Sequence, residues 1–229
     1  LKVGYVPDYC ADEVADHTCA AALALLRKLA SLDASVRAGE WAAVKHAKPM
    51  KPFAETIFGF FGMGQIGQAI LVRLKGFGFS FVVADPGLSK AQAAEAGVTL
   101  VDSDTLLATA DIISLNAPAN AQTTNFFNAA RLSRMQSHAM IVNSARGQLI
   151  VEDDIAAALE NGVIGGAALD VFHAEPLSMS SRLRNAPNLV LTPHAAWYSE
   201  AAIGRLQGLV AQDIERALGG DAPRKPVRM

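Results

Sequence analysis

The chain has 229 residues, of which 51 % are hydrophobic, and its formal net charge at pH 7 is −2. This composition predicts a folded protein with a large core, and the charge gives no support for a nucleic-acid-binding or membrane-surface protein. No uncharged apolar run reaches the length of about 18 residues that a membrane span requires, so no membrane partner is expected.

The first part of the chain predicts a lead-in followed by one long helix. Residues 1–11 lead in, Asp12 and Glu13 open a helix that runs to about residue 38, and Gly39 ends it. Residues 41–51 predict a basic connecting loop. The two cysteines, Cys10 and Cys19, have no C-x-x-C partner, so we expect free thiols in a cytoplasmic protein and no metal site.

A glycine-rich turn follows the first strand candidate. The apolar run 57–61 predicts a buried strand, Gly62, Gly64 and Gly67 match G-x-G-x-x-G, and residues 65–77 have helical spacing. This arrangement is typical of a pyrophosphate cradle, since the free N–H groups at the start of the helix attract phosphate. A second strand, 80–84, ends in Asp85, whose carboxylate can accept hydrogen bonds from ribose hydroxyls and would repel a 2′-phosphate.

Strand and helix signals then alternate to the end of the chain. We expect helices at 89–96, 103–108 with Ser103 as its cap, 129–135, 152–160 and 199–218, strands at 98–101, 111–115, 139–142, 167–171 and 188–191, and a frayed tail at 221–229. Such alternation predicts an α/β fold with a Rossmann-type doubly wound parallel sheet. Ligands bind such sheets beyond the carboxyl ends of the strands.

Three polar residues fall in those carboxyl-end loops, namely Arg146, Glu175 and His194. Taken singly, each has a plain structural explanation: a surface arginine, a turn cap and a structural histidine. Together they suit the reduction of a 2-keto acid. A guanidinium can grip a carboxylate, an imidazole can exchange a proton near neutral pH, and a carboxylate beside it favours the imidazolium form.

The chain resembles the NAD-binding part of the D-isomer-specific 2-hydroxyacid dehydrogenase family, and within it most closely the branch of the C-terminal-binding protein corepressors. The resemblance covers nearly the whole chain, and its last run, ending in W-Y-S-E, points to that branch. It rests on five runs: residues 62–68, 84–86, 142–147, 166–171 and 192–200.

The resemblance implies a role for each matching residue. Arg146 would bind and polarise the substrate, Glu175 would pair with His194, and His194 would be the general acid and base. Trp197 would wall the pocket, with core or dimer packing as its alternative. The residues implied in NAD binding are Thr18, Gly62, Gly64, Gln65, Ile66, Gly67, Asp85, Ala117, Pro118, Thr123, Ser144, Ala145, Arg146, Asp170, His194 and Trp197.

The resemblance also implies a domain organisation. Residues 1–11 would be a remnant of a substrate domain that is largely missing here, 12–198 the NAD-binding domain with 12–38 as its interdomain and dimer helix, and 199–229 a helix and tail returning to the substrate domain. Family members carry roughly a hundred further residues before this point, so this chain alone would turn over poorly.

Two functions stay open at this stage. The first is an NAD-dependent dehydrogenase acting on a small 2-hydroxy or 2-keto acid as a homodimer, and the second is an NAD(H)-sensing dimeric binding protein. NAD rather than NADP rests on Asp85, although Lys90 is a nearby cation. Asp16 and His17 are expected on the helix surface.

Overall fold

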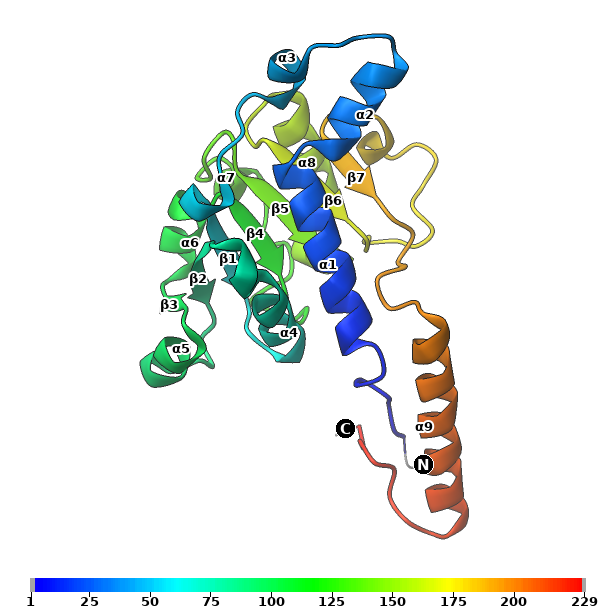
Figure 1. The fold of residues 1–229 in the computed structure, drawn as a ribbon. Coiled ribbons are helices and arrows are strands. Elements are labelled where there is room, and N and C mark those ends of the chain that lie inside the picture. The colour runs from blue at the N-terminus through cyan, green and yellow to red at the C-terminus, as the bar shows by residue number, and fades with distance from the viewer. Residues whose placement is uncertain (1–2, 228–229) are drawn as a thin grey trace.

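The computed structural model describes residues 3–227, and within them seven parallel strands form one sheet in the order β3-β2-β1-β4-β5-β6-β7 (Figure 1). The order reverses between β1 and β4, which creates the crevice where doubly wound sheets bind ligands. The predicted Rossmann-type fold is therefore confirmed. The strands are β1 Ile57–Phe61, β2 Ser80–Ala84, β3 Thr99–Leu100, β4 Ile112–Leu115, β5 Met140–Asn143, β6 Gly166–Leu169 and β7 Leu189–Leu191.

Helices cover both faces of the sheet, and each face has its own core. Side chains of α1, α4 and α5 pack with Phe58 and Phe60 on one face, and those of α6, α7 and α8 pack with Phe61 and Ile113 on the other. Burial on both faces explains why the strands read as continuous apolar runs. The helices are α1 Ala11–Leu26, α2 Leu29–Arg37, α3 Ala43–Ala47, α4 Gln65–Leu74, α5 Lys90–Ala96, α6 Ser103–Thr109, α7 Ala129–Leu132, α8 Glu152–Glu160 and α9 Glu200–Leu218.

The single helix expected over residues 12–38 is wrong, because the chain breaks into α1 and α2. Lys28 has a φ of 52°, in the left-handed region that seldom suits a residue with a side chain. Neither glycine nor proline marks this break, so no local pattern predicts it. Beyond the break Leu29 is 56 % exposed, although it continues the apolar spacing of the buried face of α1.

Smaller corrections concern helix ends and the connector. Asp102, not Ser103, caps α6, since its side chain accepts the Thr105 N–H. α7 ends at Leu132, α4 gives way to a 3-10 turn over Lys75–Phe77, and the basic connector contains the short helix α3. Ser89 forms a capping box with Gln92 at the start of α5, which the serine and glutamine spacing favours.

The tail at 221–229 is not frayed where the structure describes it. The Tyr5 N–H donates to the Lys225 carbonyl, and the Val227 N–H donates to the Val3 carbonyl. The tail thus pairs with the start of the chain, beside α9, which extends away from the sheet (Figure 1). Such a pairing depends on contacts more than two hundred residues apart, which local patterns cannot reveal.

The amino edge of the sheet carries a buried ionic cluster around Asp111. One carboxylate oxygen lies 2.7 Å from Lys51 Nζ and 2.5 Å from His138 Nε2, and the other accepts the Ile57 N–H at 2.8 Å. Asp111 is 4 % exposed. The cluster ties the connector to the beginnings of β1, β4 and β5.

Candidate active site

A cleft of about 860 Å³ opens beyond the carboxyl ends of β1, β2 and β4. It lies at the reversal of the strand order, where the sequence predicts the ligand. The residues of the predicted cofactor set that line it come from three loops: Gly62, Gly64, Asp85, Ala117, Pro118 and Thr123.

The glycine turn between β1 and α4 forms the floor of this cleft. Gly62 has a φ of 93°, and a Cβ atom there would lie 2.9 Å from the Ala117 nitrogen, so only glycine fits this close approach. At Gly64 an added Cβ would meet open space, which leaves the backbone accessible to a ligand. Gln65 and Ile66 begin α4, and the N–H groups of a first helical turn have no partner within the helix.

Asp85 anchors the second strand loop to the glycine turn. Its two carboxylate oxygens accept the Met63 N–H at 2.7 Å and the Gly87 N–H at 2.8 Å. Each oxygen keeps capacity for a further donor, so two hydroxyls could bind where a phosphate would be repelled. Lys90 also lines the cleft. Together, three features fit a dinucleotide: the close backbone approach at Gly62, the open space at Gly64 and the fixed carboxylate of Asp85.

Glu175 and His194 contact each other directly at this edge. His194 Nδ1 lies 2.6 Å from Glu175 Oε2, and Glu175 Oε1 accepts the Phe172 N–H at 3.0 Å. Partial burial acts to raise the pKa of the Glu175 carboxyl, but the hydrogen bonds from His194 and Phe172 outweigh it and hold that pKa below its usual value. Glu175 is therefore a carboxylate at neutral pH, and Nδ1 of His194 carries the proton between them.

The second nitrogen of His194 is free for chemistry. Within residues 3–227, Nε2 makes no hydrogen bond, and the side chain is 48 % exposed. His194 has a φ of 53°, a conformation that costs energy for a non-glycine residue and often marks a functional position. Glu175 thus orients the imidazole ring through Nδ1, while Nε2 stays open to a ligand.

Asp170 holds the backbone around His194. Its carbonyl accepts the His194 N–H at 2.8 Å, and its carboxylate oxygens accept the Ala195 and Ala196 N–H groups at 2.8 and 2.9 Å. The side chain is 3 % exposed. The structure therefore places Asp170 beneath the loop, where one of its carboxylate oxygens still has capacity for a ligand amide.

Arg146 lies in the exposed loop after β5, two strands away from His194 in the sheet order. One of its terminal nitrogens donates to the Ala145 carbonyl at 2.6 Å. Asn143 shapes the loop, because its side chain donates to the Arg146 carbonyl and accepts the Ala145 N–H. The strand order brings this loop to the same edge as Glu175 and His194, which contact each other directly.

Two other predicted residues lie beside or below this edge. Thr18 is fully buried in α1, and its Oγ1 lies 2.6 Å from Ser144 Oγ. Trp197 is half-buried, and its ring centroid lies 6.3 Å from that of Tyr9 and 5.7 Å from that of Tyr198.

Sequence reasoning missed three residues that shape the site: His17, Thr192 and Asn143. His17 Nε2 lies 3.2 Å from Thr192 Oγ1, so His17 faces the loop that carries His194. Asp16 is exposed on the helix surface, as expected, and it pairs with Arg73. Thr192 stands directly before the Pro193-His194 pair, and Asn143 ends a strand. That position, where a polar residue ends or follows an apolar run, could have indicated Thr192 and Asn143, whereas His17 lies inside a helix and carries no such signal.

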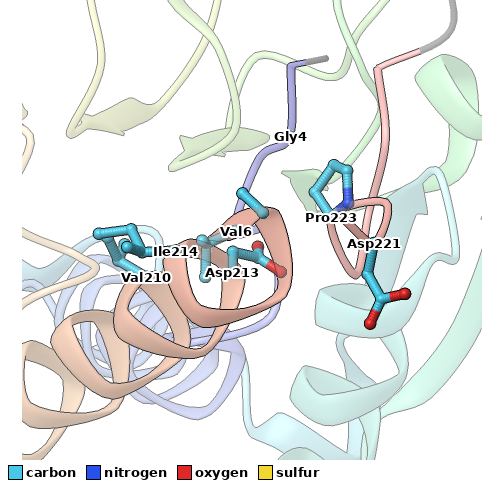
Figure 2. Close-up of a pocket in the computed structure, with 8 residues that line it drawn as sticks. Gly4, Val6, Val210, Asp213, Ile214, Asp221 and Pro223 are labelled. Atoms are coloured by element: carbon cyan, nitrogen blue, oxygen red, sulfur yellow. The ribbon is translucent and has the colours of Figure 1, made fainter. Parts of the chain in front are cut away.

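A cavity far from this edge and a buried thiol carry less chemistry. A cavity of about 560 Å³ lies between α9 and the two ends of the chain, lined by Val6, Val210 and Ile214 with the carboxylates of Asp213 and Asp221 (Figure 2). Burial raises the pKa of Cys19 to about 11, so this thiol stays protonated and packs in the core. Among the described residues, no helix combines the length and the apolarity that crossing a membrane demands.

Comparison with known proteins finds a family model that matches most of this chain. Residues 19–196 match the D-isomer specific 2-hydroxyacid dehydrogenase, NAD binding domain. A D-3-phosphoglycerate dehydrogenase of Synechocystis sp. is 37 % identical over 215 residues, 94 % of this chain and 38 % of the relative. A D-3-phosphoglycerate dehydrogenase of Methanocaldococcus jannaschii is 35 % identical over 224 residues, 97 % of this chain and 42 % of the relative.

Among solved structures, the NAD complexed form of a D-isomer specific 2-hydroxyacid dehydrogenase from Lactobacillus delbrueckii ssp. bulgaricus superposes with a TM-score of 0.85 at 28 % identity. The match covers 100 % of this chain and 72 % of that chain. The chain spans less than half the length of the two curated relatives it matches. The predicted resemblance is confirmed at the level of the family, while the corepressor-like branch stays a prediction.

Proposed function

The chain belongs to the D-isomer specific 2-hydroxyacid dehydrogenase family as an NAD-binding domain, and from this premise we propose that it transfers hydride between NAD(H) and a small 2-keto or 2-hydroxy acid. The observation that carries the proposal is the Glu175–His194 pair at 2.6 Å with an unpaired second imidazole nitrogen. Because the chain spans 38 % of one relative, the activity is proposed for the protein that carries this chain.

His194 acts as the general acid and base in this proposal. Glu175 accepts the Nδ1 proton and fixes the tautomer, so Nε2 is the atom that exchanges a proton with the substrate oxygen. In reduction the imidazolium donates its Nε2 proton to the oxygen as it becomes a hydroxyl, and in oxidation neutral Nε2 takes the hydroxyl proton. A group positioned in this way contributes about 10²- to 10⁴-fold to the rate.

Arg146 binds the substrate in this proposal. Its guanidinium spends one N–H on the Ala145 carbonyl, which holds the side chain at the edge of the sheet and leaves four N–H donors. Two parallel donors can bind a planar carboxylate and orient the neighbouring keto group. NAD(H), when bound, supplies or accepts the hydride.

The residues that would hold the dinucleotide are those of the cleft. The glycine turn and the first turn of α4 offer N–H groups to the pyrophosphate, and Asp85 offers its remaining acceptor positions to the adenine ribose. Ala117, Pro118 and Thr123 form the facing wall. Trp197 and Asp170 are proposed at the nicotinamide end, which lies toward the loops after β6 and β7.

A panel of 2-keto acids with NADH, assayed on the protein that carries this chain, tests the proposed reaction. We expect at least one of them to oxidise NADH, which is followed by loss of its absorbance. If NADH binds and none of the acids oxidises it, the chain belongs instead to an NAD(H)-sensing binding protein.

Replacing Asp85 with Ala serves as the matched cofactor variant, and we expect it to weaken NADH binding more than NADPH binding.

We also propose that a second copy of the chain covers the segment from α2 to α3. Four apolar side chains project there into solvent: Leu29, Val36, Trp41 and Val44, with Trp41 90 % exposed. Isolated apolar side chains are common, but a cluster of this kind marks an interface. Light scattering should give the mass of a dimer for the unaltered protein and of a monomer for a Trp41→Glu, Val44→Glu double variant.

A further inference from the structure

Two adjacent residues of α1 contact the two loops that carry the proposed catalytic groups. Thr18 contacts Ser144, two residues before Arg146, and His17 contacts Thr192, two residues before His194. α1 packs against β5 and β6, and β6 lies between β5, which precedes the Arg146 loop, and β7, which precedes the His194 loop. One turn of helix therefore links the two halves of the site.

The first link has a fixed direction. Thr18 Oγ1 donates to the Val14 carbonyl at 2.7 Å, and a hydroxyl has only one proton to give. The 2.6 Å contact between Thr18 and Ser144 must therefore have Ser144 as its donor. The Ser144 hydroxyl therefore donates its proton to Thr18, and this hydrogen bond holds the start of the Arg146 loop against the buried face of α1.

The second link also has a fixed direction, and it reaches the backbone of His194. Thr192 Oγ1 donates to Asp170 Oδ1 at 2.6 Å, so the proton in its 3.2 Å contact with His17 comes from His17 Nε2. Asp170 in turn accepts the N–H groups that follow His194. A chain of hydrogen bonds thus runs from His17 through Thr192 and Asp170 to the catalytic loop.

We propose that His17 and Thr18 are positioning residues that set the spacing between the Arg146 loop and the His194 loop. The catalytic meaning of that spacing rests on the proposed function. Neither residue needs to touch substrate, since each acts through the loop it holds. Displacements of about an ångström between reacting groups lower rates strongly, so a helix that fixes both loops has a direct effect on turnover.

Paired variants on this chain separate the two links. His17→Leu removes one donor and His17→Gln restores an N–H at a similar place, while Thr18→Val removes the hydroxyl and Thr18→Ser keeps it. Asp16→Asn is the control, because Asp16 lies next to them on α1 but pairs with Arg73. Amide hydrogen exchange measures each loop without any need for activity.

The account expects two separate responses. His17→Leu should speed the exchange of the Ala195 and Ala196 amides about fivefold or more and leave the Ala145 amide unchanged, while Thr18→Val should do the reverse. His17→Gln and Thr18→Ser should restore protection, and Asp16→Asn should change neither loop. In the protein that carries this chain, His17→Leu and Thr18→Val should both lower kcat, and His17→Leu should do so with little change in NADH affinity.

Each failure has its own meaning. If both variants speed exchange equally in both loops, or in neither, the two-link positioning is overturned even where 2-keto acids are reduced. If the exchange pattern appears but no 2-keto acid is reduced by any form of the protein, the proposed function fails and the links stand as a feature of the fold. If kcat is unchanged in variants whose loops are loosened, the positioning role is overturned.

Discussion

Glu175 and His194 at the carboxyl edge of the sheet make almost the same contact as Asp111 and His138 at the amino edge, with nitrogen to oxygen distances of 2.6 and 2.5 Å. The difference lies in their surroundings. Asp111 is 4 % exposed and also binds Lys51 and the Ile57 N–H. Glu175 and His194 are 38 % and 48 % exposed, and His194 keeps one nitrogen without a partner among residues 3–227.

This comparison shows that a carboxylate beside an imidazole is not in itself a catalytic feature. The Asp111 cluster joins a connector to the beginnings of three strands, so its charges serve the fold. The Glu175 pair stands in loops beyond the strands, next to a glycine turn and within an edge that can bind ligands. The proposed catalytic pair differs from the structural pair in its position and in its open imidazole nitrogen, not in the contact between carboxylate and imidazole.

The largest expected effect comes from replacing each of the two histidines with glutamine. In the protein that carries this chain, His194→Gln should lower the turnover of a 2-keto acid by about 10²- to 10⁴-fold, since it removes the proposed general acid. His138→Gln is the matched control and should leave turnover unchanged. Steady-state rates with NADH in excess measure both, and an active His194→Gln variant would remove His194 from the mechanism.

When the carboxylates are removed and the free energy of unfolding is measured, the Asp111–His138 pair should show the larger effect. Asp111→Ala should lower the free energy of unfolding by about 3 kcal/mol, because it leaves Lys51, His138 and a buried N–H without their partner. Glu175→Ala should cost less than about 1 kcal/mol, since exposed pairs contribute little. Urea unfolding followed by circular dichroism checks both values. Equal losses would show that the two pairs do not differ as described.

The smallest expected effect is a difference in acid sensitivity. Burial acts to raise the pKa of Asp111, but the hydrogen bonds from Lys51, Ile57 and His138 outweigh it and lower that pKa. A carboxyl with a lowered folded pKa stabilises the fold above its unfolded pKa of about 3.9, and this stabilisation is lost as the pH falls through the folded pKa.

The stability difference between the unaltered chain and Asp111→Asn should therefore be constant near pH 7 and shrink below about pH 4. The same comparison with Glu175→Gln should give a smaller change of the same sign, because the pKa of Glu175 is also lowered but the pair is exposed. Thermal unfolding across this pH range measures both. A difference that grows toward acid pH would contradict the assignment.

The sequence predicted the carboxyl edge far better than the rest of the molecule, and the reason is physical. Buried parallel strands are short apolar runs, and Gly62 needs a backbone conformation that side chains disfavour, so both leave local signals. Glu175 and His194 lie in the loops that follow β6 and β7, where polar residues stand out. Their direct contact required only that neighbouring strands share an edge.

The features that escaped prediction depend on distant partners. Asp111 looks like the first residue of a strand, and nothing near it in sequence announces Lys51 or His138. The break at Lys28 has no glycine or proline, the tail pairs with the start of the chain, and His17 faces a threonine 175 residues away. Each needs the folded arrangement to be seen, because the energy that fixes it comes from tertiary contacts.

The most direct test of the central claim uses the two histidines as reporters in one experiment. Imidazole nitrogen resonances of His194 and His138 are recorded by NMR while NADH and then oxamate, an unreactive analogue of a 2-keto acid, are added to the protein that carries this chain. The account predicts that the Nε2 resonance of His194 shifts with saturation and that the resonances of His138 do not. Saturable NADH binding that leaves His194 unchanged would contradict it.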